Sequence, residues 1–456
     1  MILAGLVVGL MTIFVAGFGV TLLLLQTAPR LNGFECFCLS WLFGCGTVSV
    51  LLFVCGTLVS GLTLQVLVTV CCVAIGFWGW KMGQRSQVQF VFPLPTSPMQ
   101  WLLVGVVALQ ISAIFFISCK HTLGWDGLIN WEIKARYAFL NGGSVPAQYY
   151  QSDSRVFTHP QYPLMIPMTE LWLYLWMGEP NQFGVKAIFP FFYATGATLL
   201  ALLGGRLAGR PWPGYLAAVL LFFVPFITDD NGGVVVGYAD FPLSVFYLVA
   251  IGYLLLFLAA GESRHFYIYA ASLALLPWTK REGSILWLVG GVAGALVLWR
   301  NKHSYRAWLI LALTPLILLA WRVYLRVLQT FDLDDFMAVS FGTLRLNAGR
   351  AIPIGRELLF EMVRLSNWSL FWLVVVAAFL YRVARRKDFC LLILFIAVFA
   401  PIALYASSYF FSGHKDYLWH IGTSLPRLLL QMVLVAWLVV ALALRPPDAI
   451  SANRPQ

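Results

Sequence analysis

Acidic side chains stand at the edges of two apolar stretches, where a carboxylate is costly without a role. Asp126 and Glu132 lie in "WDGLINWEIKAR", directly after an apolar run, and Asp240 lies in "GYADFPL", at the start of another. A carboxylate placed there can accept a proton from a hydroxyl group as a general base. It can equally cap a helix by accepting backbone N–H groups. Spacing alone leaves both interpretations open for Asp126 and Asp240.

Charged residues and histidines also occur in three other connections between apolar runs. They are Lys280, Arg281 and Glu282 in "WTKREGS", His159 in "THPQYPLMIP", and His420 and Arg427 in "HKDYLWHIGTSLPR". Consecutive charges at a membrane boundary are costly unless they pair or bind a ligand. Lysine binds phosphate as a point charge and arginine as a planar fork. Acids and cations together suit a hydroxyl acceptor and a phosphate-bearing lipid, although snorkelling cations and a solvated loop histidine remain alternatives.

The composition indicates which kind of scaffold must position these residues. The chain has 456 residues, of which 61% are hydrophobic and only 11% are charged. Soluble domains are about a quarter charged, and the apolar runs here approach the 20 residues that a membrane helix needs. We therefore predict an all-α polytopic membrane protein. The net charge of +11 does not indicate nucleic-acid binding, because the basic residues are scattered over short connections.

The apolar runs predict thirteen membrane spans. They cover residues 2–26, 36–58, 62–81, 100–119, 183–205, 212–228, 239–260, 266–282, 284–299, 307–328, 367–381, 389–410 and 425–444. The apolar piece 162–177 is short and contains two prolines and Glu170. We interpret this piece as a helix at the membrane interface, or dipping into it, that does not cross.

The charge distribution supports this count and orients the chain. With the N-terminus outside, the inner side holds 15 basic and 4 acidic residues, and the outer side holds 15 of each. The inner-side basic residues are Arg30, Lys81, Arg85, Arg206, Arg210, Arg264, Arg300, Lys302, Arg306, Arg382, Arg385, Arg386, Lys387, Arg445 and Arg454, and the acids are Glu35, Glu262, Asp388 and Asp448. Excess positive charge marks the cytoplasmic side of membrane proteins. Counting 162–177 as a span would destroy this pattern.

The predicted domain organisation has two parts. Residues 1–99 form a three-span N-terminal module with few charges, and residues 100–456 form a polar-lined core. Two long outer loops follow, at about 120–182 and 329–366. Helical spacing in the first loop places Leu128, Ile133 and Tyr137 on an apolar stripe, and Asp126 and Lys134 on another face. This predicts an amphipathic helix on the outer surface.

The order of these motifs resembles a known family. An acid after the first core span is followed by H-P-x-x-P, by "FGVKAIFPFFYATGATLLALLGGRLAG", by A-D-x-P-L and by T-K-R-E-G. Together they resemble the GT-C-type membrane glycosyltransferases, most closely the branch of protein O-mannosyltransferases and lipid A aminoarabinose transferases. The resemblance covers residues 100–300, and more vaguely the rest. It implies a GT-C-type helical bundle and a polyprenyl-phosphate-linked sugar donor.

The resemblance also implies roles for individual residues. Asp126 corresponds to the catalytic base, and Asp240, with Glu132 nearby in sequence, to the second acid that assists the acceptor, the phosphate or a metal. Lys280 and Arg281 correspond to donor-phosphate binders, to which Arg427 is added as a third cation. His159, Glu282 and His420 are further pocket candidates. Gly127 follows Asp126 where relatives often have a second acid, so a divalent cation is possible but not required.

The function expected from this reasoning is transfer of a sugar to an acceptor hydroxyl on the outer face of a bacterial-type inner membrane, with inversion at the anomeric carbon. The acceptor can be a glycan, a lipid or a protein. One alternative is a GT-C-type polymerase or ligase with a diphosphate-linked donor, which Arg345, Arg350 and Arg356 keep open. Another is a lipid or solute transporter, for which charges near the bilayer midplane would be expected.

Overall fold

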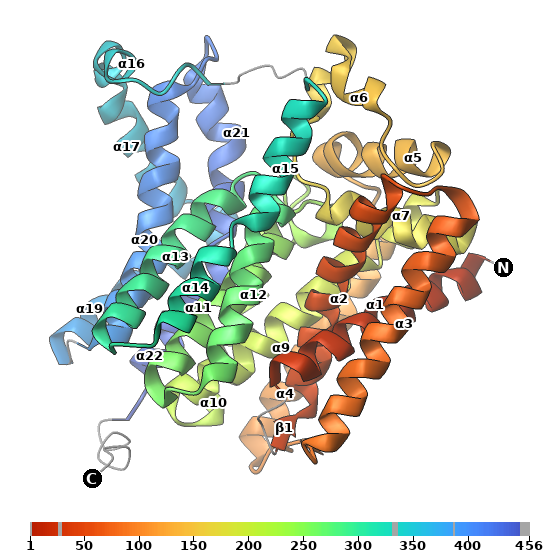
Figure 1. The fold of residues 1–456 in the computed structure, drawn as a ribbon. Coiled ribbons are helices and arrows are strands. Elements are labelled where there is room, and N and C mark those ends of the chain that lie inside the picture. Colours follow the sequence, from red (N-terminus) through yellow and green to blue (C-terminus); the bar gives the residue numbers. More distant parts are fainter. Residues whose placement is uncertain (1, 26–29, 331–335, 386–387, 447–456) are drawn as a thin grey trace.

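Helices make up almost all of the described structure. The computed structural model describes residues 2–25, 30–330, 336–385 and 388–446 (Figure 1). Four of the residues assigned above to the inner side, Arg386, Lys387, Asp448 and Arg454, lie outside these ranges. The prediction of an all-α polytopic membrane protein is confirmed, with one short pair of strands as the exception among the described residues.

The N-terminal module contains three long helices and both strands. They are α1 (Ile2–Leu25), β1 (Arg30–Asn32), α2 (Gly33–Gly56), α3 (Gly61–Arg85) and β2 (Gln89–Val91). Strands β1 and β2 are parallel, with Leu31 opposite Phe90. Glycines let the helices approach closely, since a Cβ on Gly17 would lie 1.7 Å from the Ser40 carbonyl oxygen and one on Gly79 would lie 2.2 Å from the Gly19 carbonyl oxygen. Such small-residue contacts are typical of membrane helices.

The first long loop follows α4 (Pro98–Lys120) and is built from short helices. These are the π-helix η1 (Gly127–Glu132), α5 (Ile133–Leu140), α6 (Ala147–Gln151), the 3-10 helix η2 (Asp153–Thr158) and α7 (Met165–Met177). Helix α7 has 13 residues and is almost wholly buried against α1, α2 and α5. The piece 162–177 is therefore a packed helix too short to cross the membrane, rather than one lying loosely at its surface.

The central bundle surrounds α11. It contains α8 (Gln182–Val185), α9 (Ile188–Ala208), α10 (Pro211–Leu221), η3 (Pro225–Thr228), η4 (Val234–Val236), α11 (Asp240–Ala260), α12 (Ser263–Thr279), α13 (Gly283–Arg300), α14 (Tyr305–Leu313) and α15 (Leu316–Val327). Every residue of α11 from Asp240 to Phe257 is buried, so this helix is the axis of the bundle.

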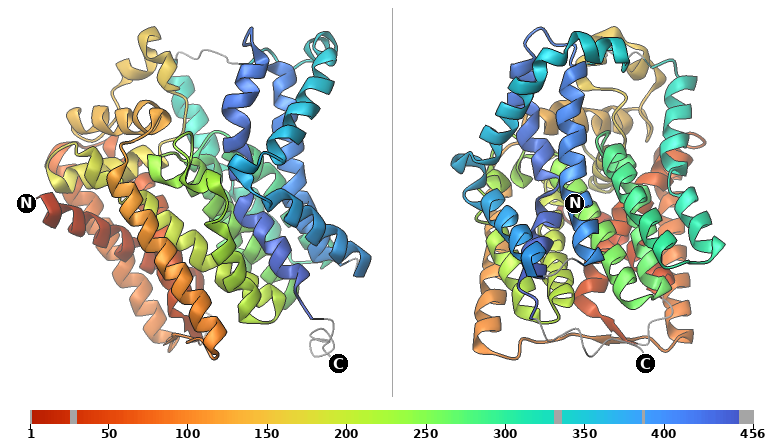
Figure 2. Two further views of the ribbon diagram at one scale, coloured as in Figure 1. Left: turned by 180° about the vertical axis from the view of Figure 1, so that it is seen from behind. Right: turned by 90° about the vertical axis from the view of Figure 1, so that its left-hand side faces the viewer.

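The C-terminal part forms a lobe that joins the bundle through α22 (Val433–Ala443), which packs against α9, α10 and α11 (Figures 1 and 2). It contains α16 (Phe341–Leu346), η5 (Ala348–Arg350), α17 (Ala351–Met362), α18 (Leu365–Trp368), α19 (Phe371–Arg385), α20 (Phe389–Ser408), η6 (Tyr409–Phe411), α21 (Tyr417–Leu430) and α22. Helices α21 and α22 form one apolar path that bends by 48° at its break. The bend lies directly beside Gln431.

The structure has fewer long spans than the thirteen predicted. Within the described residues, nine helices are long and apolar enough to cross a membrane, or ten if the bent pair α21–α22 counts as one span. The other three predicted spans, 212–228, 266–282 and 367–381, correspond to α10, α12 and α19, with 11, 17 and 15 residues. The predicted lengths of 266–282 and 367–381 match those of α12 and α19, although the helices are displaced by a few residues. Only the length of 212–228 was overestimated, because apolar residues continue past the end of α10 into a 3-10 turn.

Contacts between connections still agree with thirteen alternating passes. The two ends of the molecule are here called the loop end, with α5, α6 and α16, and the strand end, with β1 and β2 (Figure 1). Contacts at the loop end join Gly61 to Gly142, Gly124 to Val236, Gln151 to Leu328, and Arg350 to Tyr409. Contacts at the strand end join Glu35 to Arg206, Arg300 to Phe389, and Arg382 to Asp388. In the thirteen-span topology, the two residues of each pair belong to connections on the same side of the membrane.

Candidate active site

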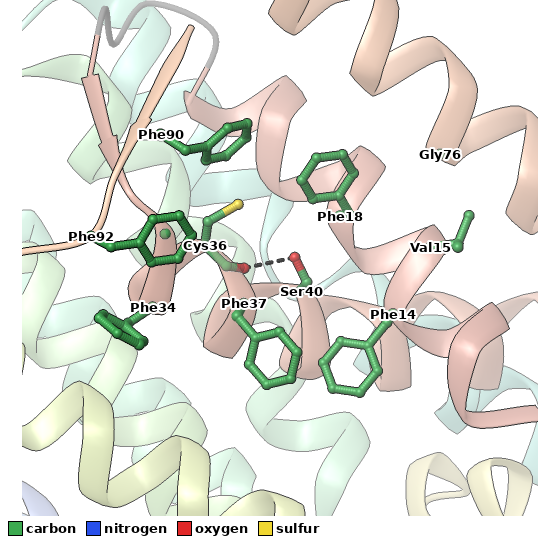
Figure 3. Close-up of a pocket in the computed structure, with 11 residues that line it drawn as sticks. Phe14, Val15, Phe18, Phe34, Cys36, Phe37, Ser40, Gly76, Phe90 and Phe92 are labelled. Atoms are coloured by element: carbon green, nitrogen blue, oxygen red, sulfur yellow. Dashed lines mark hydrogen bonds between the residues drawn. The ribbon is translucent and has the colours of Figure 1, made fainter. Parts of the chain in front are cut away.

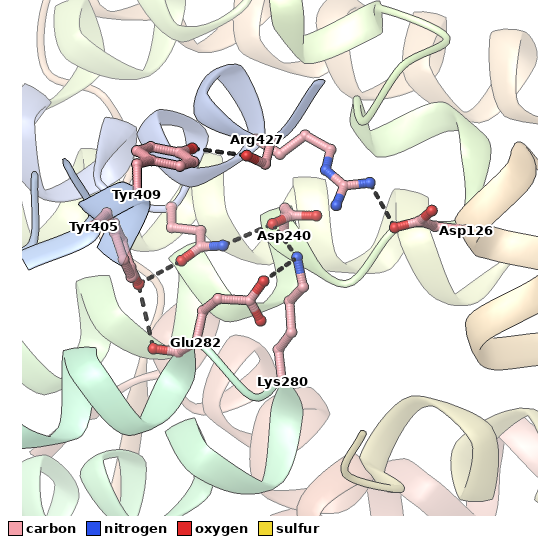
Figure 4. Close-up of polar contacts among 9 residues, drawn as sticks. Asp126, Asp240, Lys280, Glu282, Tyr405, Tyr409 and Arg427 are labelled. Atoms are coloured by element: carbon pink, nitrogen blue, oxygen red, sulfur yellow. Dashed lines mark hydrogen bonds and ion pairs between the residues drawn. The ribbon is translucent and has the colours of Figure 1, made fainter. Parts of the chain in front are cut away.

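Two of the acids that the sequence predicts for the site, Asp126 and Asp240, each accept a hydrogen bond from a cationic side chain (Figure 4). Asp126 Oδ2 accepts a hydrogen bond from the Arg427 guanidinium at 2.5 Å. Asp126 lies at the start of η1 and Arg427 on α21, so the contact ties the first outer loop to the C-terminal lobe. The guanidinium also lies over the Tyr238 ring, 5.4 Å from its centroid. These contacts define one wall of the candidate site.

Asp240 lies at the centre of a second, more deeply buried set of contacts. Its Oδ1 accepts hydrogen bonds from Lys280 Nζ at 2.6 Å and from Gln431 Nε2 at 2.7 Å. Asp240 and Lys280 are each 1% exposed. Tyr405 donates its hydroxyl to Gln431 Oε1 at 2.7 Å and so fixes the orientation of that amide. Burying an ion pair is costly unless its polar atoms also form hydrogen bonds. Gln431 provides one such hydrogen bond to Asp240.

Glu282 and Arg281 complete the charged cluster. Glu282 Oε1 lies 3.2 Å from Lys280 Nζ. Arg281 is half-buried, with its guanidinium 5.9 Å from the centroid of the Phe336 ring. Three acids, Asp126, Asp240 and Glu282, thus lie with two paired cations, Lys280 and Arg427, and Arg281 adds a third positive charge at the border. The cluster is electrically balanced before any ligand arrives.

Two buried polar atoms of this cluster have no hydrogen-bond partner among the described residues. They are Arg427 Nε, a donor, and Glu282 Oε2, an acceptor. A buried polar atom without a partner costs about 1–3 kcal/mol. The cluster therefore offers a charged donor and a charged acceptor to a ligand that carries both an anionic group and a hydroxyl.

The turn at His159 borders the cluster and is held in place by Lys134. His159 has φ 47° and ψ 67°, a left-handed backbone that is uncommon for this residue type. Lys134 Nζ donates to the carbonyl oxygens of Asn130, Thr158 and His159, at 2.7, 3.1 and 2.9 Å. The His159 ring stacks on Tyr162 at 4.8 Å. Because Tyr162 interacts electrostatically with Asp126 and Arg427, this turn forms part of the site wall.

Lys134 itself is wholly buried, which changes its protonation. Burial lowers the pKa of Lys134 to about 7, and the charges of Asp126 and Glu170 act against this shift. Glu170 on α7 is also fully buried, and neither of its carboxylate oxygens has a partner among the described residues. Burial raises the pKa of Glu170 well above its usual range, and Glu132 adds to the shift. The polar face predicted for residues 126–140 therefore points into the protein.

Glu132 and His420 are placed away from the ion pairs of the cluster. Glu132 accepts hydrogen bonds from Arg136 Nη2 at 2.9 Å and from the Tyr174 hydroxyl at 2.7 Å, which ties η1 to α7. His420 Nδ1 lies 2.9 Å from Ser412 Oγ, in the turn between α20 and α21. The structure thus brings together Asp126, Asp240, Lys280, Glu282 and Arg427, with Arg281 and His159 at the border.

The helix-capping interpretation of the two aspartates is wrong. Neither side chain makes a capping hydrogen bond, because Asp126 binds Arg427 and Asp240 binds Lys280 and Gln431. Sequence reasoning missed Gln431, Tyr405 and Lys134 as members or supports of the cluster. Gln431 had a recognisable signal, since it interrupts the apolar run "LLLQMVLV".

The donor set does not form a metal site in the described residues, where no three His, Cys, Asp or Glu side chains are grouped to hold an ion. Asp126 and Asp240, the acids that could contribute to one, face cationic side chains instead. Comparisons with protein-family models, with characterised proteins and with solved structures gave no match to this chain.

Proposed function

We propose that this protein is a membrane glycosyltransferase that moves a sugar from a polyprenyl-phosphate donor to an acceptor hydroxyl. The observation that carries the proposal is the balanced cluster in which Arg427 holds Asp126 and Lys280 holds Asp240. Its unpartnered Arg427 Nε and Glu282 Oε2 match a phosphate and a sugar hydroxyl. The resemblance in motif order to GT-C-type enzymes points in the same direction.

In the proposed reaction, donor binding changes the partner of Arg427. The donor phosphate takes up the guanidinium, which releases Asp126 Oδ2 to accept a proton. The acceptor oxygen attacks the anomeric carbon, its O–H proton passes to Asp126, and the bond from that carbon to the phosphate oxygen breaks. The leaving phosphate gains a negative charge, which Arg427 and Arg281 stabilise. Direct displacement inverts the anomeric centre.

Lys280 and Asp240 have a supporting role in this scheme. Lys280 is already paired with Asp240 and Glu282, so its main role is to hold these two acids in position beside the phosphate. Asp240 is then the second acid, which fixes Gln431 and, one helical turn away, Arg427. Of the three predicted phosphate binders, Lys280, Arg281 and Arg427, this scheme gives the direct contact to Arg427 and Arg281 and a supporting role to Lys280.

The proposed location follows from charge and from the substrate. The cluster lies at the loop end, which the positive-inside pattern assigns to the outer face of a bacterial-type inner membrane. A polyprenyl tail keeps the donor in the bilayer while its phosphate reaches the membrane boundary. The acceptor is a glycan, lipid or protein hydroxyl that reaches the same side.

A reconstitution assay tests the proposal. Purified protein in liposomes is supplied with polyprenyl-phosphate-linked hexoses and pentoses together with membrane extract as acceptor source, and free polyprenyl phosphate is measured. We expect release that depends on both protein and acceptor. Release only from diphosphate-linked donors would favour the polymerase or ligase alternative. Movement of intact donor across the bilayer without cleavage would favour the transporter and contradict the proposal.

A further inference from the structure

A second feature lies at the opposite end of the molecule from the charged cluster. The N-terminal module carries an apolar cavity of about 740 Å³, open to the surface, between α1, α2, α3 and the segment after α3 (Figure 3). Six phenylalanine rings line it: Phe14, Phe18, Phe34, Phe37, Phe90 and Phe92. Its lining on α2 runs from Gly33 to Ser40, which is about 10 Å at the usual helical rise.

The chemistry of the lining selects an alkyl chain. The Ser40 hydroxyl lines the cavity but donates to the Cys36 carbonyl oxygen at 2.6 Å, so its hydrogen is already used. The other lining groups are apolar or are the Cys36 thiol. Because the walls belong to membrane helices, the molecules that reach the cavity are those dissolved in the bilayer. A long, apolar cavity of this kind fits a lipid acyl chain.

The rim of the cavity indicates the charge of the head group. Strand β1 begins at Arg30, opposite Gln89 and beside the Leu31–Phe90 pair. Lys81 and Arg85 lie near the end of α3, beyond Gly76 in the cavity wall. All three cations are exposed, and no described acid forms an ion pair with them.

The one acidic residue of the N-terminal module, Glu35, is already neutralised. Glu35 at the start of α2 is 7% exposed and binds the Arg206 guanidinium and the Tyr253 hydroxyl. The strand end of the module, beside the cavity, therefore carries three uncompensated positive charges. Cations at a membrane surface attract anionic lipids. The cations therefore suit the head group, and the cavity suits the acyl chain, of one anionic lipid.

We propose that the N-terminal module binds an anionic phospholipid of the cytoplasmic leaflet, with an acyl chain in the phenylalanine-lined cavity and the head group at Arg30, Lys81 and Arg85. This site is independent of the proposed glycosyl transfer. It gives the three leading helices a binding role of their own, at the end of the molecule away from the cluster.

The test measures lipid binding to purified, delipidated full-length protein by native mass spectrometry. The probes are dioleoyl phosphatidylglycerol and dioleoyl phosphatidylcholine, which share their chains and differ in head-group charge. We expect tighter binding of the anionic lipid. Replacing Arg30, Lys81 and Arg85 by Gln should weaken phosphatidylglycerol binding at least about tenfold and remove the preference.

Matched variants separate this site from general lipid contact. A control variant removes three exposed cations elsewhere on the same predicted side, by Arg210→Gln, Lys302→Gln and Arg306→Gln. This variant should keep the preference for phosphatidylglycerol. Val15→Phe narrows the cavity and should weaken both lipids, whereas Val7→Phe, on the same helix and outside the cavity, should not. Equal affinity of the unaltered protein for the two lipids would overturn the proposal. The proposal would also be overturned if the two triple variants changed the affinity for phosphatidylglycerol equally. It would be overturned likewise if Val15→Phe bound both lipids as tightly as the unaltered protein does.

Discussion

Arg427 and Asp126 are separated by 301 residues in the chain and meet as an ion pair at 2.5 Å. The contact joins the start of the first outer loop to the last membrane passage. Four residues after Arg427, Gln431 binds Asp240, directly beside the 48° bend between α21 and α22. Arg427 on α21 and Gln431 just after it thus hold two of the three acids of the candidate site, and any displacement of Arg427 by a ligand also affects the position of α21.

Replacing Asp126 by Asn should remove transfer while preserving the fold. The amide can still meet Arg427 through its oxygen, but it cannot take the acceptor proton. Loss of a general base slows a reaction by about 10²–10⁴-fold. The measurement is the rate of polyprenyl phosphate release by the variant, with thermal unfolding as the control for folding. A well-folded Asp126→Asn protein with normal turnover would reject the assignment of Asp126 as the base.

The buried pair Asp240–Lys280 should show strong energetic coupling. Removing one partner of a buried ion pair costs about 3–5 kcal/mol, because the other charge is left uncompensated. We expect Lys280→Met to cost more than Asp240→Asn, since Glu282 still holds Lys280 in the second variant. The free energies of unfolding of both single variants and the double variant give the coupling. Effects that add to within about 0.5 kcal/mol would mean that the pair is not coupled.

Lys134 should make stability depend on pH. Burial lowers its pKa from 10.5 to about 7 in the folded protein. Between about pH 7 and its unfolded pKa, the unfolded chain therefore binds the proton that the folded chain has released, and rising pH favours folding. The thermal unfolding midpoint of the unaltered protein minus that of Lys134→Met should therefore increase with pH in this window. A difference that stays constant or shrinks would contradict the assignment.

The alternating arrangement of helices predicts opposite sides for two exposed connections. Lys302 lies between α13 and α14 at the strand end, and Gly342 lies on α16 at the loop end. Single cysteines at these positions, with the exposed Cys119 replaced by Ser, should react with an impermeant maleimide from opposite sides of sealed vesicles. Gly342 should react from the outside. Labelling of both from one side would refute the topology.

The sequence predicted the members of the cluster better than their partners. Asp126, Asp240 and Lys280 each stand at the end of an apolar run, where a charge is conspicuous because it is costly. Their pairing depends on how distant helices pack, and no local pattern records that Arg427 reaches Asp126. Lys134 shows the same limit, since its helical spacing placed it on a polar face but could not show that this face is buried.

The length of one predicted span, 212–228, was wrong for a related reason. The apolar run behind the predicted span 212–228 continues through Pro225, but α10 ends at Leu221 and the chain turns into a 3-10 helix. Hydropathy measures whether residues tolerate an apolar environment, and it does not show whether they are helical. In the buried interior of this protein, short helices and irregular segments satisfy the same pattern.

The central claim is that Arg427 gives up Asp126 to bind a lipid-linked phosphate. Its most direct test is the affinity of a polyprenyl monophosphate for the unaltered protein and for Arg427→Gln, with the corresponding polyprenyl alcohol as the control ligand. Loss of a charge-assisted hydrogen bond costs about 1.5–3 kcal/mol, or roughly tenfold to a hundredfold in affinity. We predict such a loss for the phosphate and none for the alcohol. Equal affinity of both proteins for the phosphate, or equal binding of phosphate and alcohol by the unaltered protein, would contradict the account.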